Sequence, residues 1–373
     1  MNKSLVYIST IQFGYHIDAY KHCQYLKEDF KITFICFDYG YQKIKEIGIE
    51  IIYVPWKGSY VSKGIDFMKS CLKLIKSRKV DFIFAVYFPL VSLFKTLSPN
   101  KNIILDIRTG SINTSRKNRI ITNNLIRFES FFFKKISVIS ESLALNLKLN
   151  MKKVFILPLG SDILSTKSKS FDSLRLFYIG TLDGRNIHQS IFGLKLFLDK
   201  FSDNNINVSY DIVGYGTEAV ENKLKKAIED TGLQKLVVFY GRKTHEESKY
   251  FFDNCNIGVS HIPITEYYDC QPPTKTFEYI NAGMVCIATE TQENKKIVNA
   301  DNGVLCKDSP EGFCKALSEV SKDLVKWDSK IIRKTQSNST WATISKNLKN
   351  YILNSDPKNY SAEKSKNHKT NTF

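Results

Sequence analysis

The segment from Gln271 to Gly283 carries residues whose types and spacing could bind a ligand. Two prolines precede a Thr-Lys-Thr triplet, which predicts a helix beginning near Thr274. A helix start has unpaired N–H groups and a partial positive charge, so it favours anions, and Lys275 adds a full charge there. Glu278 follows about one turn later, and an ionised carboxylate accepts hydrogen bonds from hydroxyl groups. The combination predicts a site for a diphosphate beside a polyol such as ribose, which together describe a nucleotide.

A second candidate anion site follows the strand-like segment 175–179. Gly180 ends that segment, and a glycine there lets a ligand approach the backbone closely. The next loop contains Thr181 and Arg185. An arginine is suited to a diphosphate because its guanidinium can donate paired hydrogen bonds. A surface turn with an exposed arginine is the alternative interpretation.

Gly214 and Gly216 lie between a predicted strand and a predicted helix. A Gly-x-Gly turn alone is weak evidence for a nucleotide site, because any tight strand-to-helix turn needs such residues. The following predicted strand ends just before Arg242, for which a solvated Arg-Lys pair is one interpretation.

Length and composition limit the class of protein. The 373 residues, 43% hydrophobic and 24% charged, predict two globular domains. A formal charge of +17 indicates anionic partners: nucleotides, nucleic acid or an acidic lipid surface. The eight cysteines form no C-x-x-C pair, which predicts buried thiols in a reducing compartment. We expect a cytoplasmic protein, because neither a signal peptide nor a membrane-spanning segment is evident.

Strand-like and helix-like segments alternate twice along the chain, which predicts two doubly wound α/β domains with parallel sheets. We place the first domain at residues 1–163 and the second at 171–335, separated by a polar, turn-rich segment. Apolar residues at helical spacing predict a last helix in 336–354. Residues 355–373 are polar and lysine-rich, which predicts a disordered tail.

The segment around Lys275 and Glu278 resembles the donor-site signature of retaining glycosyltransferase family 4, the glycosyl transferases of group 1. In that family two glutamates at a fixed spacing precede a small-residue turn and an apolar strand. Glu278 matches the second glutamate, whereas the first would fall on Cys270. Either Asp269, one position away, replaces it, or backbone amides of the Pro-Pro-Thr loop do.

The resemblance covers nearly the whole chain and implies the GT-B fold, in which two Rossmann-like domains face each other across a cleft. It also implies that the last helix returns to the first domain. It assigns the donor phosphates to Arg185 and Lys275, and the ribose to Glu278. Further donor-side residues implied by it are Gly180, Thr181, Gly214, Gly216, Arg242, Thr274 and Thr276. On the acceptor or sugar side it implies Gly14, His16, Asp106 and Arg108, for which a helix-capping histidine and a structural ion pair are the alternatives.

The implied activity is transfer of a sugar from a UDP- or GDP-sugar to a glycan or lipid-linked saccharide, with retention, in bacterial surface polysaccharide synthesis. No bound cofactor or metal is expected, because Arg and Lys replace the metal. The stretch 115–135 is rich in basic and aromatic residues, which makes an anionic membrane surface, on the inner face, a candidate partner. A core helix with a solvated basic edge is the alternative interpretation. Alternatives are a sugar-nucleotide epimerase of the same fold, using Asp106 and His16, and a basic nucleic-acid-binding protein, although no nucleic-acid-binding motif is evident.

Overall fold

The computed structural model describes residues 2–201 and 207–354, so the tail expected at 355–373 lies outside the described residues. The chain divides into two compact units. The described part of the first unit comprises 2–159 and 341–354, and the second unit is Gly160–Thr340. The division falls beside the turn-rich segment that follows Pro158.

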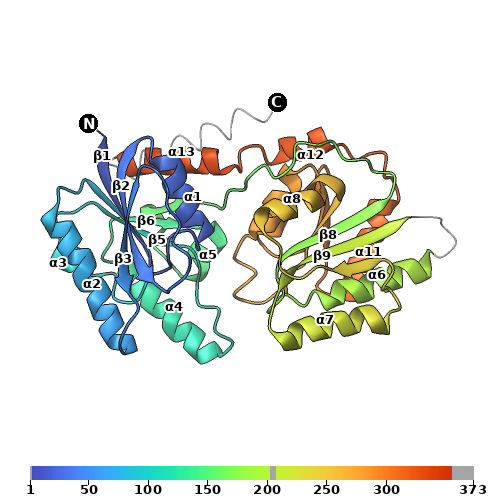
Figure 1. Cartoon of the computed structure of the whole chain (residues 1–373), viewed down its shortest axis with the longest axis horizontal. Helices are drawn as coiled ribbons and strands as arrows, with labels where there is room; N and C mark the ends of the chain where they lie inside the picture. Colours follow the sequence, from blue (N-terminus) through green and yellow to red (C-terminus); the bar gives the residue numbers. More distant parts are fainter. Residues whose placement is uncertain (1, 202–206, 355–373) are drawn as a thin grey trace. The chain divides into compact units, whose positions relative to one another are not determined.

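The first unit contains a seven-stranded parallel sheet in the order β3-β2-β1-β4-β5-β6-β7. Its strands are β1 (Lys3–Ile8), β2 (Phe30–Asp38), β3 (Ile49–Pro55), β4 (Phe82–Val86), β5 (Ile103–Ile107), β6 (Lys135–Val138) and β7 (Val154–Ile156). The strands are mostly buried and apolar, as expected for a parallel sheet that is covered on both faces (Figure 1).

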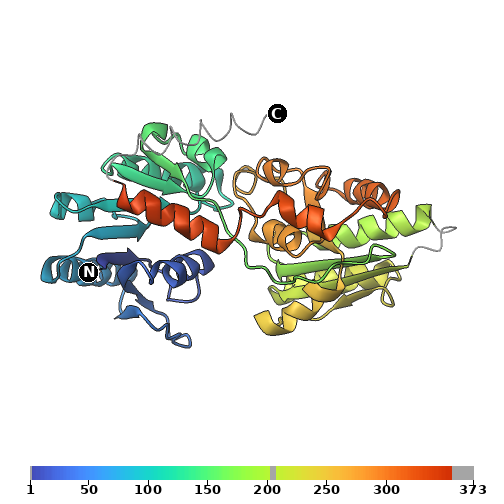
Figure 2. The ribbon, with the colours of Figure 1, turned by 90° about the horizontal axis from the view of Figure 1, so that it is seen from above.

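Helices cover both faces of this sheet. They are α1 (Ile17–Leu26), α2 (Tyr60–Ser77), α3 (Leu93–Leu97), α4 (Arg116–Ser130), α5 (Glu141–Asn146) and α13 (Trp341–Leu353), with a 3-10 turn at Met151–Lys153. The helix α13, red in Figure 2, packs against α1 and contributes Leu348 and Ile352 to the same core cluster as Leu5 and Tyr7 of β1. Phe67 of α2 instead packs against Phe37 and Phe88.

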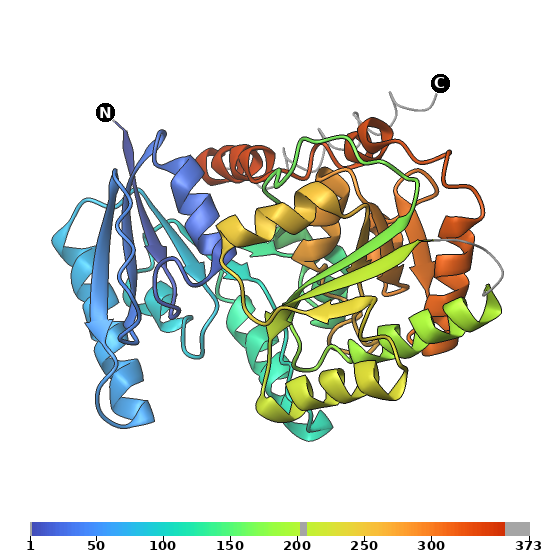
Figure 3. The same cartoon turned by 45° about the vertical axis from the view of Figure 1, so that its right-hand side comes forward.

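The second unit contains a six-stranded parallel sheet in the order β10-β9-β8-β11-β12-β13. Its strands are β8 (Leu174–Thr181), β9 (Val208–Tyr215), β10 (Val237–Phe239), β11 (Ile257–Ser260), β12 (Val285–Thr289) and β13 (Gly303–Cys306). Its helices are α6 (His188–Lys200), α7 (Glu218–Asp230), α8 (His245–Asn254), α9 (Thr274–Asn281), α10 (Asn294–Ile297), α11 (Pro310–Ser321) and α12 (Ser329–Thr335). The helix α6 packs against α7 and α11, whereas α8 lies on the other side of β8 and β9 (Figure 3).

A buried charged network joins α1 to the sheet of the first unit. Arg108, just after β5, donates to one Asp18 oxygen from Nε at 2.8 Å and from Nη2 at 2.6 Å. It also donates from Nη1 to the Leu157 carbonyl at 2.7 Å. Asp106 accepts a hydrogen bond from the Ser137 hydroxyl at 2.7 Å, and burial raises the pKa of its carboxyl to about 6. The network therefore contains one firmly paired carboxylate, Asp18, and one whose ionised form is poorly solvated.

We expect Asp18→Asn to lower the free energy of unfolding by about 3–5 kcal/mol, because the buried Arg108 guanidinium loses its hydrogen-bonded carboxylate and keeps only the more distant Asp106, whose Oδ1 lies 3.8 Å from Nη1. Asp106→Asn is the matched control. At pH 7.5 this variant should lose less free energy of unfolding than Asp18→Asn does. Above pH 6 the wild-type Asp106 carboxylate is ionised in a site that disfavours charge. Urea unfolding of both variants measures the difference. A larger loss for Asp106→Asn would contradict this assignment.

Candidate functional site

The strand order of the second unit places a topological switch point at the carboxyl ends of β8 and β11. The chain leaves β8 towards β9 on one side and later returns to β11 on the other, so the loops after these two strands diverge. Open α/β sheets bind ligands at such a switch point. The loop after β8 carries Arg185, and the segment after β11 leads to Lys275 in the first turn of α9.

Lys275 lies over the aromatic ring of Tyr178, with Nζ 4.0 Å from the ring centroid. The Tyr178 hydroxyl donates to the Thr181 carbonyl at 2.6 Å, which fixes the ring. A Cβ atom at Gly180 would lie 2.9 Å from Lys275 Nζ, and the φ of Gly180 is +142°. Only glycine combines that backbone conformation with room for the ammonium group. Gly180 therefore belongs to the site because it admits Lys275.

Arg185 supplies the second cation. Its guanidinium lies 4.2 Å from the ring centroid of Tyr268, and Nη1 is a buried atom with no hydrogen-bond partner. Arg185 is close enough to Lys275 to contribute to the lowering of the lysine pKa. Within residues 2–201 and 207–354, neither side chain forms an ion pair with a carboxylate. Two neighbouring cations and an unused buried donor are groups that could bind a multiply charged anion.

Lys275 and Glu278 are both half-buried, and their surroundings shift the pKa values of both groups. Burial, followed by the charge of Arg185, lowers the pKa of Lys275 to about 7. Burial raises the pKa of Glu278 to about 7, against the opposing effect of Lys275. Such shifts in a crevice are characteristic of functional groups, because a bound ligand can supply the missing charge and hydrogen-bond partners. The structure therefore brings together Arg185, Lys275 and Glu278.

The two threonines that flank Lys275 differ. Thr276 is buried, where its hydroxyl donates to Asn294 Oδ1 at 3.0 Å and shares a hydrogen bond with Ser260 at 2.7 Å. It joins α9 to β11 and α10. Thr274 is half-buried at the start of α9, where Pro273 provides no side-chain cap. Of the two, Thr274 has the exposure that ligand contact requires.

Asp269 faces the turn after β12. Its two oxygens accept hydrogen bonds from the backbone N–H of Gln292 at 2.8 Å and from the Gln292 side chain at 2.7 Å. Cys270 is buried, with its sulfur near the carbonyls of Glu266 and Tyr267. These contacts give Asp269 a structural role in the loop, independent of the role that the first glutamate has in the family.

We therefore expect Asp269→Asn to lower the melting temperature while leaving kcat for sugar transfer nearly unchanged, because its oxygens are already bonded to Gln292. Thermal unfolding and initial-rate kinetics measure the two effects. Cys270→Ser is the matched control in the same loop and should retain kcat as well. A large loss of kcat in Asp269→Asn without a change in melting temperature would instead assign the acid a direct role in the reaction.

The remaining donor-side residues lie at neighbouring strand ends. A Cβ atom at Gly214 would lie 2.1 Å from the Gly180 carbonyl, so this glycine permits the close approach of β8 and β9. A Cβ atom at Gly216 would meet Leu182 at 3.1 Å. Arg242 is exposed with its guanidinium 4.7 Å from the ring centroid of Tyr215, and Thr181 is also exposed. Arg242 and Thr181 are thus accessible to a ligand.

The acceptor-side residues lie in the first unit, and the structure does not bring all of them to the surface. Gly14 has a φ of +90°, and a Cβ atom there would lie 2.2 Å from Ile44, so the turn requires glycine. His16 is half-buried before α1 and makes no side-chain cap, and burial lowers its pKa. Asp106 and Arg108 are buried in the network with Asp18. For these two residues the structural ion pair describes the geometry better than contact with a sugar.

Three aromatic or imidazole groups of the site were not predicted. Tyr178 and Tyr268 lie against Lys275 and Arg185, respectively. His261, just after β11, is buried near Lys275; burial lowers its pKa to about 4, so the ring is neutral at pH 7. The position of Tyr178 in β8, two residues before Gly180, was the only available signal. The others come from a loop without regular spacing.

Among residues 2–201 and 207–354, no group of three or more His, Cys, Asp and Glu side chains is arranged to hold a metal ion. The same part of the chain contains no helix that is both long and apolar enough to cross a membrane.

Comparison with solved structures defines the class of fold as GT-B. Sucrose-phosphate synthase from Thermosynechococcus elongatus superposes with a TM-score of 0.71 at 14% identity, covering 94% of this chain and 98% of that one. HepE from Anabaena, in complex with UDP and glucose, gives 0.70 at 12% identity, covering 94% and 99%. An E. coli protein titled trehalose-6-phosphate, bound with UDP-2-fluoro glucose, gives 0.71 at 9% identity, covering 94% and 99%. The predicted fold class is confirmed.

The family comparison is more specific. Residues 173–323 match the family model described as glycosyl transferases group 1, and this range contains Arg185, Lys275 and Glu278. The resemblance recognised in the sequence is therefore confirmed for the second unit, and the protein is an enzyme of the glycosyltransferase class. A search of curated protein sequences finds no match.

Proposed function

We propose that this enzyme transfers a sugar from a nucleoside-diphosphate sugar, with retention at the anomeric carbon, to a glycan or lipid-linked saccharide. The observation that supports it most is the pair of cations, Arg185 and Lys275, at the switch point of the second sheet, with Glu278 one turn behind Lys275. The cations would bind the pyrophosphate, and the carboxylate would accept hydrogen bonds from the ribose.

In the reaction, the bond between the anomeric carbon and the diphosphate oxygen breaks, and a bond to the acceptor oxygen forms on the same face. The acceptor proton moves to an oxygen of the departing diphosphate. Negative charge grows on that diphosphate, and preorganised cations beside it lower the barrier. Arg185 and Lys275 would provide this stabilisation in place of a metal ion. We assign the protein no nucleophilic side chain.

UDP-sugars are the first donors to test, with GDP-sugars as the alternative. The support comes from structural neighbours, which include HepE in complex with UDP-glucose and the E. coli protein bound with UDP-2-fluoro glucose. The glycosyltransferase match disfavours both the epimerase and a nucleic-acid-binding protein. The burial of Asp106 also removes one of the two groups on which the epimerase would depend.

We further propose that the enzyme acts in the cytoplasm, at the inner face of a membrane. Its product would serve bacterial surface polysaccharide synthesis. The support for the proposal is a surface of the first unit where Phe128, Phe131 and Phe132 are exposed. A cavity of about 410 Å³ in the same unit is lined by Lys3, Lys95, Lys101, Lys134 and Lys135. Aromatic side chains beside lysines suit an anionic lipid surface.

A thermal-shift panel of UDP-, GDP- and ADP-sugars tests the proposal. Ligands that bind only the folded protein raise its melting temperature, and at 100 times Kd the stabilisation is about 2.7 kcal/mol. We expect one nucleotide series to stabilise the protein and Arg185→Ala to lose that stabilisation. If no member of the panel binds the wild-type protein, the proposal is contradicted.

A further inference from the structure

A cavity of about 550 Å³ lies at the carboxyl edge of the first sheet, whose switch point falls between β1 and β4. The loop after β1 contributes Thr10, and the loop after β4 contributes Phe88 and Leu90. The site residues considered above do not line this cavity.

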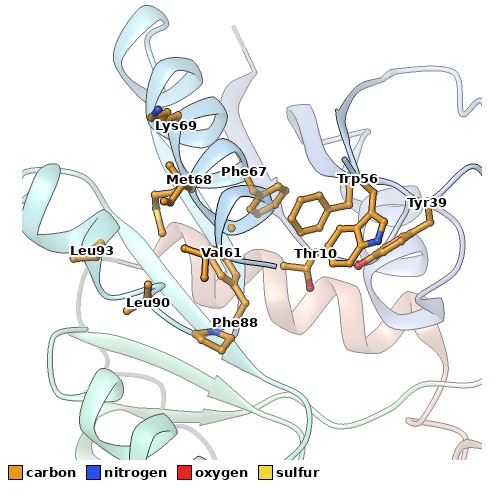
Figure 4. Close-up of a pocket in the computed structure, with 14 residues that line it drawn as sticks. Thr10, Tyr39, Trp56, Val61, Phe67, Met68, Lys69, Phe88, Leu90 and Leu93 are labelled. Atoms are coloured by element: carbon orange, nitrogen blue, oxygen red, sulfur yellow. The ribbon is translucent and has the colours of Figure 1, made fainter. Parts of the chain in front are cut away.

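The cavity walls are apolar. Figure 4 shows Tyr39 and Trp56 on one side, Leu90 and Leu93 on the other, and Met68 of α2 between them. Phe37, Phe67 and Phe88 complete the wall as a chain of ring contacts, with Phe37 and Phe67 centroids 4.4 Å apart and Phe67 and Phe88 5.5 Å apart. The rings are therefore held rigidly, and the space is preformed.

Such a wall does not suit a saccharide. A sugar carries a hydroxyl group on most of its carbons, and each buried hydroxyl needs a hydrogen-bond partner. The lining offers few polar side chains, among which are Thr10 and Lys69. An apolar chain needs no such partners and gains from being removed from water.

The rim of the cavity continues the apolar character outwards. Val61 and Ile65 on α2 are 69% and 48% exposed, and Leu90 before α3 and Leu93 at its start are 59% and 38% exposed. All four line the cavity. Contiguous exposed apolar residues at the mouth of an apolar cavity mark a place where a hydrophobic ligand enters.

Charge at the mouth indicates what the apolar chain is attached to. Lys63 of α2 lies with Nζ 4.1 Å from the Trp56 ring centroid, and neither Lys63 nor Lys69 forms an ion pair within the described residues. The helix α2 has four lysines and one aspartate. A cation beside an apolar cavity complements an amphiphile with an anionic head, such as a phosphate.

We propose that this cavity binds the hydrocarbon chain of a lipid-linked acceptor, with the lipid phosphate at Lys63. The inference rests on the proposed glycosyl transfer, and it selects the lipid-linked acceptor over the free glycan. The first unit of the protein would then bury the part of the hydrocarbon chain nearest the phosphate. This burial would position the attached saccharide.

Gly64 offers a direct way to fill the cavity. It lines the space, and a Cβ atom there would have no neighbour within 4 Å. Gly64→Phe therefore adds a ring on a Cβ atom that meets no neighbouring atom, and it removes a helix-disfavouring residue. Gly64→Ala controls for the loss of glycine. Lys73→Phe controls for an added ring on α2, since Lys73 is exposed and does not line the cavity.

Farnesyl monophosphate is the probe. Its binding is followed by tryptophan fluorescence of the full chain with Trp327 and Trp341 replaced by Phe, so that Trp56 is the reporter. We expect saturable quenching in the wild type, a Kd raised by at least about tenfold in Gly64→Phe, and unchanged binding in both controls. Lys63→Gln should weaken binding of farnesyl monophosphate but not of farnesol. Maltose should cause no change.

The inference is overturned if the wild type does not bind farnesyl monophosphate, if Gly64→Phe binds it as well as Gly64→Ala does, or if maltose binds instead. Stabilisation by UDP-glucose is measured on the same samples. Binding of UDP-glucose without binding of the lipid probe refutes only the lipid site. Binding of the lipid probe without any nucleotide refutes only the proposed transfer.

Discussion

Replacement of Lys275 by methionine is expected to lower the rate of sugar transfer by roughly 10²–10³-fold, the effect of losing one preorganised group that stabilises a developing anion. The methionine retains the contact with the Tyr178 ring, and it removes an ammonium group that burial already disfavours. The melting temperature of the unliganded variant should therefore be unchanged or higher. Steady-state kinetics and thermal unfolding measure the two effects.

Lys249→Met is the matched control, since Lys249 is an exposed lysine on α8 of the same unit. It should keep wild-type kinetics. A Lys275→Met enzyme with full activity, or one that has lost its folded structure, would contradict the assignment of Lys275 to the departing diphosphate.

The lowered pKa of Lys275 gives this prediction a pH dependence. The pKa is about 7, so the ammonium group is present below pH 7 and is lost as the pH rises. An anionic donor favours the protonated form, and its affinity should fall as the pH rises from 6 to 9. Titration with UDP-glucose in the Glu278→Gln background measures the effect, because Glu278, whose pKa is also about 7, would otherwise ionise over the same range and change the affinity for the ribose. Lys275→Arg should abolish the fall, because a guanidinium stays protonated throughout. The same fall in Lys275→Arg would assign the titration to another group.

Glu278→Gln is expected to weaken binding of UDP-glucose by roughly 10–150-fold, the equivalent of one hydrogen bond to a charged group, about 1.5–3 kcal/mol. Transfer should fall below detection. Inorganic pyrophosphate has no ribose, so its affinity should not fall. The amide is neutral, and burial raises the pKa of the Glu278 carboxyl, so the unliganded variant should be at least as stable as the wild type.

Isothermal titration with UDP-glucose and with pyrophosphate separates the two contributions. Glu246→Gln, a neutralised glutamate in the exposed first turn of α8, is the control. Equal losses for both ligands in Glu278→Gln would show that the carboxylate shapes the phosphate site and does not contact the ribose.

The sequence predicts the donor-side cations well because their positions follow from local structure. Lys275 follows a helix start marked by two prolines, and Arg185 follows β8, whose penultimate residue is Gly180. In a parallel sheet, strand ends share one edge, so two local signals suffice to bring both cations to the same edge of the sheet. The second domain therefore carried most of the functional information.

Residues whose environment depends on distant partners were less predictable. Arg108 donates hydrogen bonds to Asp18, ninety positions earlier in the chain. This long-range pairing buries Arg108, although its position at the end of a predicted strand indicated that it would line a cleft. Asp269 bonds Gln292, which no spacing rule connects to it. The apolar cavity is lined from several elements, among them Thr10, Trp56 and Leu90, and no single stretch of sequence contains its pattern.

A crystal structure of the full chain in complex with UDP tests the central claim most directly. We predict that pyrophosphate oxygens lie within about 2.7–3.2 Å of both Arg185 and Lys275, with a ribose hydroxyl donating to Glu278. A nucleotide bound at another edge of the sheet, or a pyrophosphate that contacts neither cation, would contradict the account.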